Sequence, residues 1–118
     1  MTNLYAELKR RLSQGFYPDN LRTVATLCEE ASWQTDNLVG LFLIAHIFWW
    51  LDDYWHERPV TSRMADRMKE IIEPPIIRYF DDAASGLTPQ DELSRLNEIA
   101  RSFLQWQHEL DDAPAGED

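Results

Sequence analysis

The most apolar stretch of this 118-residue chain is LVGLFLIAHIFWWL, residues 38–51, and Asp52 and Asp53 follow it directly. Its 14 residues fall short of the roughly 20 that a helix needs to cross a bilayer, so we predict a buried helix over about residues 37–57. A helix that is apolar on every side must be covered on every side. A chain of this size hides only about 60 to 70% of its surface on folding, so four further short helices are expected to leave part of it open. Self-association, with this helix at or near the contact, is the expected consequence.

Outward from this stretch, breaker residues divide the chain into five helical segments. Leucines at four-residue spacing predict an amphipathic helix over about 3–14, and apolar residues three and four apart predict a second over about 20–33. No Val-, Ile- and Thr-rich stretch alternates with a period of two, so no sheet is expected. The predicted fold is all-α: a compact bundle of four to five helices, forming one domain over residues 1–112, with a flexible acidic tail over 113–118.

A fourth helix is expected after Pro59, and we expect it to break or kink at Pro74-Pro75 because two backbone donors are lost there. The last helix has the clearest start, with Thr88 as N-cap and Pro89 in the first helical position. Its seven-residue apolar repeat suits either a coiled-coil seam with a second chain or packing inside its own bundle. The residues of this repeat are Leu93, Leu96, Ala100, Phe103, Gln107 and Leu110.

The chain carries 21 acidic and 11 basic residues, a formal net charge of −10 at pH 7. Such a surface repels phosphate, so we expect neither nucleic-acid binding nor docking on anionic membranes. The excess lies mostly in residues 81–118, which hold ten acidic and two basic residues, against eleven and nine in residues 1–80. This asymmetry can steer a basic protein partner; alternatively, the acids only keep the chain soluble. Candidates to pair with the acidic end of a second copy are Arg58, Arg63, Arg67 and Arg78.

The single cysteine, Cys28, excludes an intramolecular disulfide and a four-cysteine zinc site. Its spacing from Leu21, Val24 and Ala25 points it into the core, where a thiol behaves as a small apolar group. The first residues reach a charge without the apolar run of a signal peptide. We therefore expect a reducing, cytoplasmic setting.

Two pairs of side chains have the i, i+4 spacing that lets one helix offer two ligands to a metal ion. They are Asp52 with His56 and His108 with Asp112, and antiparallel packing of their helices would bring the four together. The Glu-x-x-His motif of di-metal carboxylate bundles is absent. The alternative for each pair is an exposed ion pair near a helix C-terminus, where a protonated histidine is favoured.

His46 lies inside the apolar stretch. In a pocket walled by Phe42, Trp49 and Trp50, it can serve as an axial ligand to a haem or another pigment. The alternative is a core histidine that is bonded to a carbonyl or a carboxylate.

Five tryptophans are more than one small core can fully bury, and tryptophan is enriched at the energetic centres of interfaces. Trp50 and Trp55 lie beside two aspartates and are expected to form a mixed apolar and acidic patch for a partner. The full set of predicted partner-contact residues is Trp50, Asp52, Asp53, Trp55, Trp106, Asp111 and Asp112.

These patterns favour an acidic helical protein-binding module, such as an inhibitor, an immunity-type protein or an assembly adaptor, that acts by association, without catalysis and without a cofactor. Phosphate-loop, nucleophile-elbow, dinucleotide-binding and His-Glu-x-x-His motifs are all absent. A basic protein partner and a homodimer are the expected assemblies. The alternative is a metal- or haem-binding helical bundle that uses the His and Asp residues of the central and last helices.

Overall fold

The computed structural model describes residues 4–112, with side chains up to residue 109, and forms five α-helices. They confirm the all-α bundle predicted from the sequence, and no strand occurs in the described part of the chain. The tail expected over residues 113–118 lies outside it. The helices are α1 (Leu4–Leu12), α2 (Pro18–Ala31), α3 (Leu38–His56), α4 (Ser62–Ser85) and α5 (Pro89–Asp112), with a 3₁₀ turn, η1 (Ser32–Gln34), at the end of α2.

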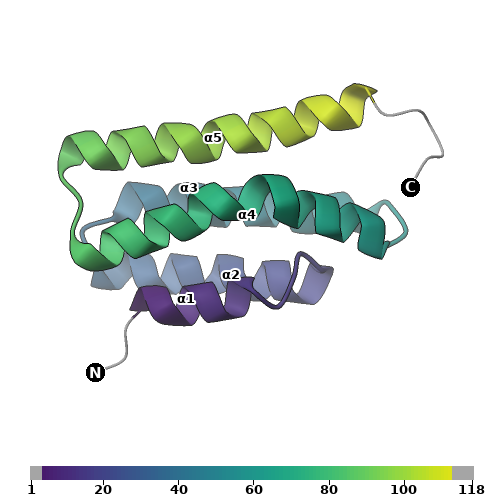
Figure 1. The fold of residues 1–118 in the computed structure, drawn as a ribbon. Helices are drawn as coiled ribbons and strands as arrows, with labels where there is room; N and C mark the ends of the chain where they lie inside the picture. The colour runs from purple at the N-terminus through teal and green to yellow at the C-terminus, as the bar shows by residue number, and fades with distance from the viewer. Residues whose placement is uncertain (1–3, 113–118) are drawn as a thin grey trace.

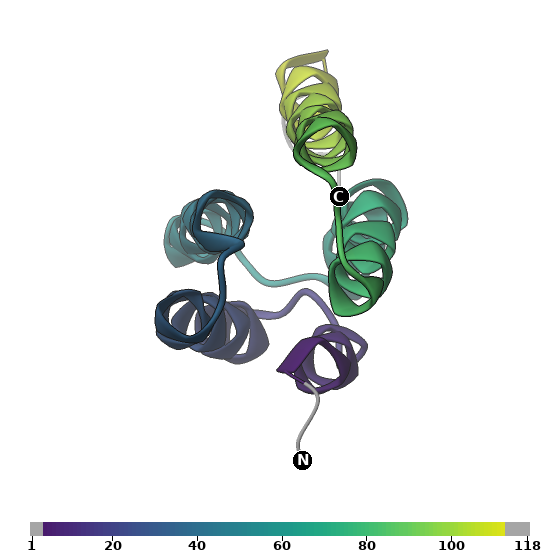
Figure 2. The same ribbon diagram turned by 90° about the vertical axis from the view of Figure 1, so that its left-hand side faces the viewer.

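Helices α1 to α4 surround one core, and α5 lies outside them along α4 (Figure 2). Each helix runs opposite to the one before it, so α3 and α5 run in the same direction (Figure 1). Helix α2 packs along α3, and α1 contacts both α2 and α4, whereas α5 touches α3 only lightly. Within residues 4–112, no helix combines the length and the apolar content that crossing a membrane takes.

The core is built from apolar side chains that recur at three- and four-residue spacing. Helix α3 contributes Leu41, Ile44, Phe48 and Leu51, all fully buried. Cys28 of α2 belongs to the same cluster, as the sequence predicts, and its burial raises the pKa of the thiol to about 12. At neutral pH this thiol is therefore protonated and a poor nucleophile.

Two threonines start the last two helices. Thr61 Oγ1 accepts a hydrogen bond from the N–H of Met64 at 3.2 Å, and Thr88 Oγ1 accepts one from the N–H of Asp91 at 3.1 Å. Pro89 occupies the first helical position of α5. The start predicted at Thr88 and Pro89 is thus confirmed.

Of the break or kink expected at Pro74-Pro75, the break is wrong, because α4 continues without interruption from residue 62 to residue 85. A proline inside a helix costs about 3 kcal/mol or more. On either side of the pair, however, Ile72, Ile76 and Tyr79 are fully buried, and burying one such side chain contributes about 1.5–3 kcal/mol. Packing on both sides of the prolines therefore holds the two halves in one helix.

Part of the apolar repeat of α5 faces its own bundle. Leu96 and Phe103 of the repeat pack against the core, and the neighbouring Trp106 is buried. Leu93, the first residue of the repeat, is exposed, as is Leu104. Packing inside the bundle therefore describes α5 better than a seam with a second chain.

Gly40 leaves room on α3 for the side chain of Tyr79, which extends from α4. A Cβ atom on Gly40 would lie 1.9 Å from the hydroxyl oxygen of Tyr79 and 2.4 Å from its Cζ. The Tyr79 hydroxyl is buried and has no hydrogen-bond partner among the described residues, and burial raises its pKa. Glycine is required here for the space that it leaves to the phenol ring.

We predict that Gly40→Ala destabilises the fold by about 1–3 kcal/mol, because the added methyl overlaps a buried ring. Helix propensity alone predicts the opposite sign, since alanine is favoured over glycine by about 1 kcal/mol inside a helix. Tyr79→Phe is the matched variant, and it should be neutral or stabilising by up to about 1 kcal/mol, because the hydroxyl that it removes is unsatisfied. Denaturant unfolding of both variants measures these changes. A Gly40→Ala protein more stable than the parent would contradict the close contact.

Candidate functional site

The outer side of α3 is apolar and exposed. Val39, Phe42, His46 and Trp49 recur at intervals of three and four residues, so they share one side of the helix. Val39 and Phe42 are 65% and 67% exposed, and His46 and Trp49 are also exposed. We refer to these four residues, with the adjacent and partly exposed Trp50, as the α3 stripe.

The stripe is exposed because the neighbouring helices cover only the flanks of α3. Helix α2 packs along one flank. On the other flank, Trp50 makes edge-on contacts with Phe103 and Trp106 of α5, with ring centroids 5.3 and 5.7 Å apart, and it stacks on Tyr54 at 6.2 Å. These contacts hold the Trp50 indole in place, so that its uncovered part forms a rigid edge of the stripe.

The exposed area equals that of the largest apolar patch on a typical monomer. The stripe and Leu38 together expose roughly 500 Å² of side chain, when a full aromatic side chain is counted as about 150–250 Å². Trp33 of η1 is 90% exposed, and η1 packs at the start of α3. Since the largest apolar patch of a typical monomer measures about 300–600 Å² and is often functional, this surface is the first candidate for a binding site.

A hollow of about 480 Å³ adjoins the stripe toward the C-terminal end of α3. Its walls consist of two indoles, two aspartates and two histidines of α3, and one arginine of α2. Its lining residues are Arg22, His46, Trp49, Trp50, Asp52, Asp53 and His56.

Asp52 is the buried polar residue of this hollow, with only 3% of its surface exposed. Its Oδ2 lies 3.7 Å from Nε of Arg22 and 3.9 Å from Nε2 of His56, and both distances exceed that of a hydrogen bond. Its Oδ1 has no hydrogen-bond partner among the described residues. Burying a carboxylate without hydrogen-bond donors is unfavourable. Arg22 and His56 offset this cost only through ion pairs that are longer than hydrogen bonds.

The indole of Trp49 is also hydrogen-bonded to a carboxylate. Its Nε1 donates a hydrogen bond to Glu29 of α2. At the other edge of the hollow, Asp53 is exposed and its Oδ1 lies 3.6 Å from Nδ1 of His56. The hollow therefore combines the aromatic walls of Trp49 and Trp50 with the carboxylates of Asp52 and Asp53.

The structure brings Trp50, Asp52 and Asp53 of the predicted partner contact together at this hollow. Trp55 and Trp106 lie elsewhere: both indoles are in the core, 4% and 1% exposed. Trp55 donates a hydrogen bond from its Nε1 to the carbonyl of Phe16 at 3.0 Å, which satisfies the indole internally. Both residues are therefore core residues in this chain. Two further predicted contacts, Asp111 and Asp112, have side chains outside the described residues.

His46 does not lie in the core. The core alternative is wrong, because His46 is exposed on the outer side of α3. The residues that the sequence places around it do surround it in part, since Trp49 and Trp50 line the same hollow. An open hollow of this kind leaves one face of any ligand in water.

The metal-ligand pairs predicted from spacing are only partly assembled. Asp52 and His56 do face each other. Helices α3 and α5 run in the same direction, however, and His108 is exposed on α5. Among the described residues, no group of three or more His, Cys, Asp or Glu side chains is placed to hold a metal ion. The side chain of Asp112 lies outside these residues.

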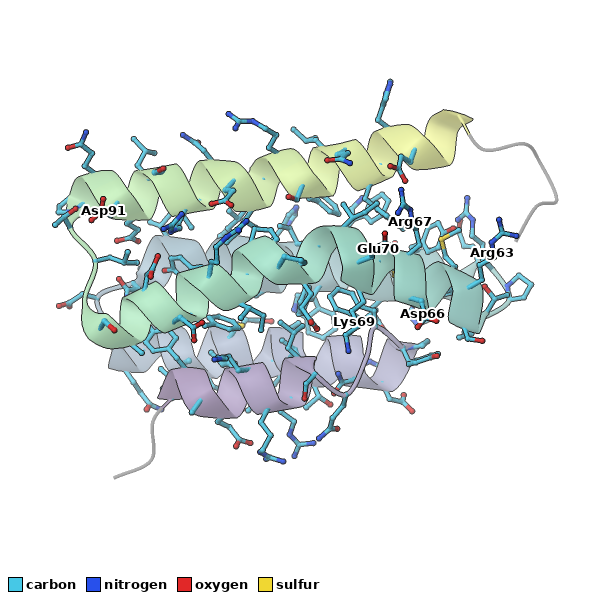
Figure 3. The ribbon with its side chains drawn as sticks, in the orientation of Figure 1. Arg63, Asp66, Arg67, Lys69, Glu70 and Asp91 are labelled. Carbon is cyan, nitrogen blue, oxygen red and sulfur yellow. The ribbon has the colours of Figure 1, made fainter. Side chains whose placement is uncertain are left out.

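Much of the acidic charge after residue 80 is paired within the chain. Arg67 extends from α4 toward α5 (Figure 3) and donates hydrogen bonds to both carboxylate oxygens of Glu109 at 2.9 Å. Arg78 pairs with Glu98. Two arginines expected as candidates for a second copy thus serve their own bundle. Further pairs join Lys9 to Asp81 and Arg95 to Asp82.

Sequence reasoning missed Arg22 and Trp33 as surface residues of this region. Arg22 reaches Asp52 only because of the way α2 packs on α3, and no linear spacing encodes that register. Trp33 falls at the end of the predicted second helix, whereas the chain turns there and leaves the indole exposed. The composition of the central helix indicated that the other helices would not cover all of it. It did not indicate which side would remain exposed.

Comparison of the chain with protein-family models, with curated proteins and with solved structures finds no match.

We predict two classes of tryptophan in quenching by acrylamide, because Trp33, Trp49 and Trp50 are accessible while Trp55 and Trp106 are shielded. Trp33→Phe should remove a large part of the quenchable fluorescence, and the control Trp106→Phe should remove none of it. Stern–Volmer plots of the three proteins measure the accessible fraction. A single shielded class in the parent protein would show that the outer side of α3 is covered in solution.

Proposed function

We propose that this chain is an acidic protein-binding module, of the inhibitor, immunity-type or adaptor kind, that holds a basic partner protein on the α3 stripe. One observation carries the proposal: an apolar helix side with exposed aromatic rings is bordered by carboxylates. Tryptophan and other aromatic anchors surrounded by polar groups are the usual composition of an interface centre and its rim. The partner surface that fits is an apolar ridge flanked by lysine or arginine side chains.

The charge around the stripe supports a basic partner. Five carboxylates lie on α3, at its ends or on the adjacent part of α2, and two guanidinium groups lie among them. The carboxylates belong to Glu29, Asp36, Asp52, Asp53 and Glu57, and the guanidinium groups to Arg22 and Arg58. Complementary charge at a rim mainly speeds association and selects the partner, while the apolar centre supplies most of the affinity.

A second copy of the chain fits this surface less well. In a two-fold contact each copy offers the same patch to the other, so the Asp53 end of one stripe would meet either Asp53 or the Asp36 end of its mate. Both ends are acidic, and each copy carries a net charge of −10. We therefore assign the stripe to a different protein and treat the homodimer as a competing outcome.

Capture with matched variants tests this proposal. Phe42→Ser removes an anchor of the stripe, and Leu104→Ser removes an equally exposed residue of α5, since the two side chains are 67% and 61% exposed. Phe42→Ser should weaken retention of a co-purifying basic protein at least about tenfold, and Leu104→Ser should leave it unchanged. Raising the salt from about 0.05 M to about 0.5 M should weaken it further.

Retention that ignores both Phe42→Ser and ionic strength would count against the proposal. Sedimentation of the purified chain separates the competing outcome. A dimer that Phe42→Ser converts to a monomer would assign the stripe to self-association instead.

A further inference from the structure

We infer that the hollow beside Asp52 accepts the guanidinium group of an arginine side chain. The inference rests on the proposed function, because it names the side chain that a basic partner would insert next to the stripe. It draws on three independent observations: a buried carboxylate without hydrogen bonds, a pair of aromatic walls and the balance of charge around the hollow.

The carboxylate of Asp52 lacks hydrogen-bond donors. It lines the hollow and is more than nine-tenths buried, its Oδ1 has no partner, and its Oδ2 is beyond hydrogen-bond distance from Arg22 and His56. A ligand that carries several N–H donors with a positive charge supplies what this group lacks. Guanidinium offers five such donors in a fixed planar arrangement.

The walls of the hollow suit a flat cation. Trp49 and Trp50 lie on two neighbouring positions of α3 and both border the hollow. A guanidinium plane stacks on an indole face through cation–π attraction, and its aliphatic stem packs on the same apolar surface. A similar cation–π contact already occurs at the end of α3. Cζ of Arg58, which follows the helix, lies 4.3 Å above the ring centroid of Tyr54.

The charge balance leaves room for one further cation. Two carboxylates border the hollow, from Asp52 and the exposed Asp53, against one resident guanidinium from Arg22. The Arg22 side chain is about half exposed and approaches Oδ2 without hydrogen bonding to it. With the imidazoles of His46 and His56 left out of the count, an incoming guanidinium brings two positive groups against two carboxylates. A metal ion is a weaker fit, since the described residues hold no group of three ligating side chains.

The probe that tests this is N-acetyl-arginine amide, with N-acetyl-citrulline amide as its uncharged match. In ¹⁵N-labelled protein, the arginine derivative should shift the indole N–H signals of Trp49 and Trp50 at millimolar concentration and leave that of Trp106 unmoved. The citrulline derivative should bind at least about tenfold more weakly, since it keeps the shape and loses the charge. N-acetyl-glutamate amide serves as the anionic probe and should produce no shift.

Two conservative variants locate the site. Asp52→Asn should weaken binding of the arginine derivative about tenfold or more, and it preserves the shape of the side chain. Asp66→Asn, at an exposed position of α4 outside the hollow, should leave binding unchanged. The dispersion of the indole signals in each free variant verifies that the fold is intact. Asp53→Asn, at an exposed position, provides a second variant should Asp52→Asn unfold the chain.

Equal binding of the arginine and citrulline derivatives would overturn the inference, as would preferential binding of the anionic probe or indifference to both Asp52→Asn and Asp53→Asn. The experiments distinguish failure of the arginine site from failure of the protein-binding function. A partner that depends on Phe42 but not on Asp52 or Asp53 would leave the protein-binding function standing and remove the arginine site. Binding of the arginine derivative, with no partner protein that depends on the stripe, would support the arginine site and remove the protein-binding function.

Discussion

Helix α3 has more apolar circumference than the other helices of this chain can cover. Its inner side packs into the core through residues such as Ile44 and Phe48, and Gly40 brings its first turn against Tyr79. Once that side is fixed, Val39 and Phe42 must point away from the bundle, because they lie on the opposite side of the same helix. The exposed stripe is therefore a geometric consequence of the core.

The same constraint explains why Asp52 is buried. Asp52 lies on the flank of α3 that faces α2, at the boundary between the core side and the open side. Shifting this carboxylate into full solvent would require turning α3, which would withdraw its apolar residues from the core. Burial of many apolar groups outweighs the unfavourable burial of one carboxylate, since each large side chain contributes about 1.5–3 kcal/mol.

Local sequence signals predicted the helices well and the packing between them poorly. The helix start at Thr88 and Pro89 was predictable because capping is a property of neighbouring residues. The continuity of α4 through Pro74-Pro75 was not, because it depends on what the flanking residues pack against. For the site, i, i+4 spacing correctly paired Asp52 with His56. The core positions of Trp55 and Trp106 and the approach of Arg22 depend on helix packing, which spacing along one helix does not report.

Ion pairing changes where the effective charge of the molecule lies. Counted along the chain, the acidic excess belongs to residues 81–118. In the fold, Glu98 and Glu109 of that segment meet arginines of α4, and opposite charges so close together largely cancel at a distance. Asp53 and Asp36, at the two ends of α3, are exposed beside apolar surface instead. The negative field that a partner meets next to an apolar contact is therefore set by α3 and its surroundings, although the sequence count places the surplus in the last third of the chain.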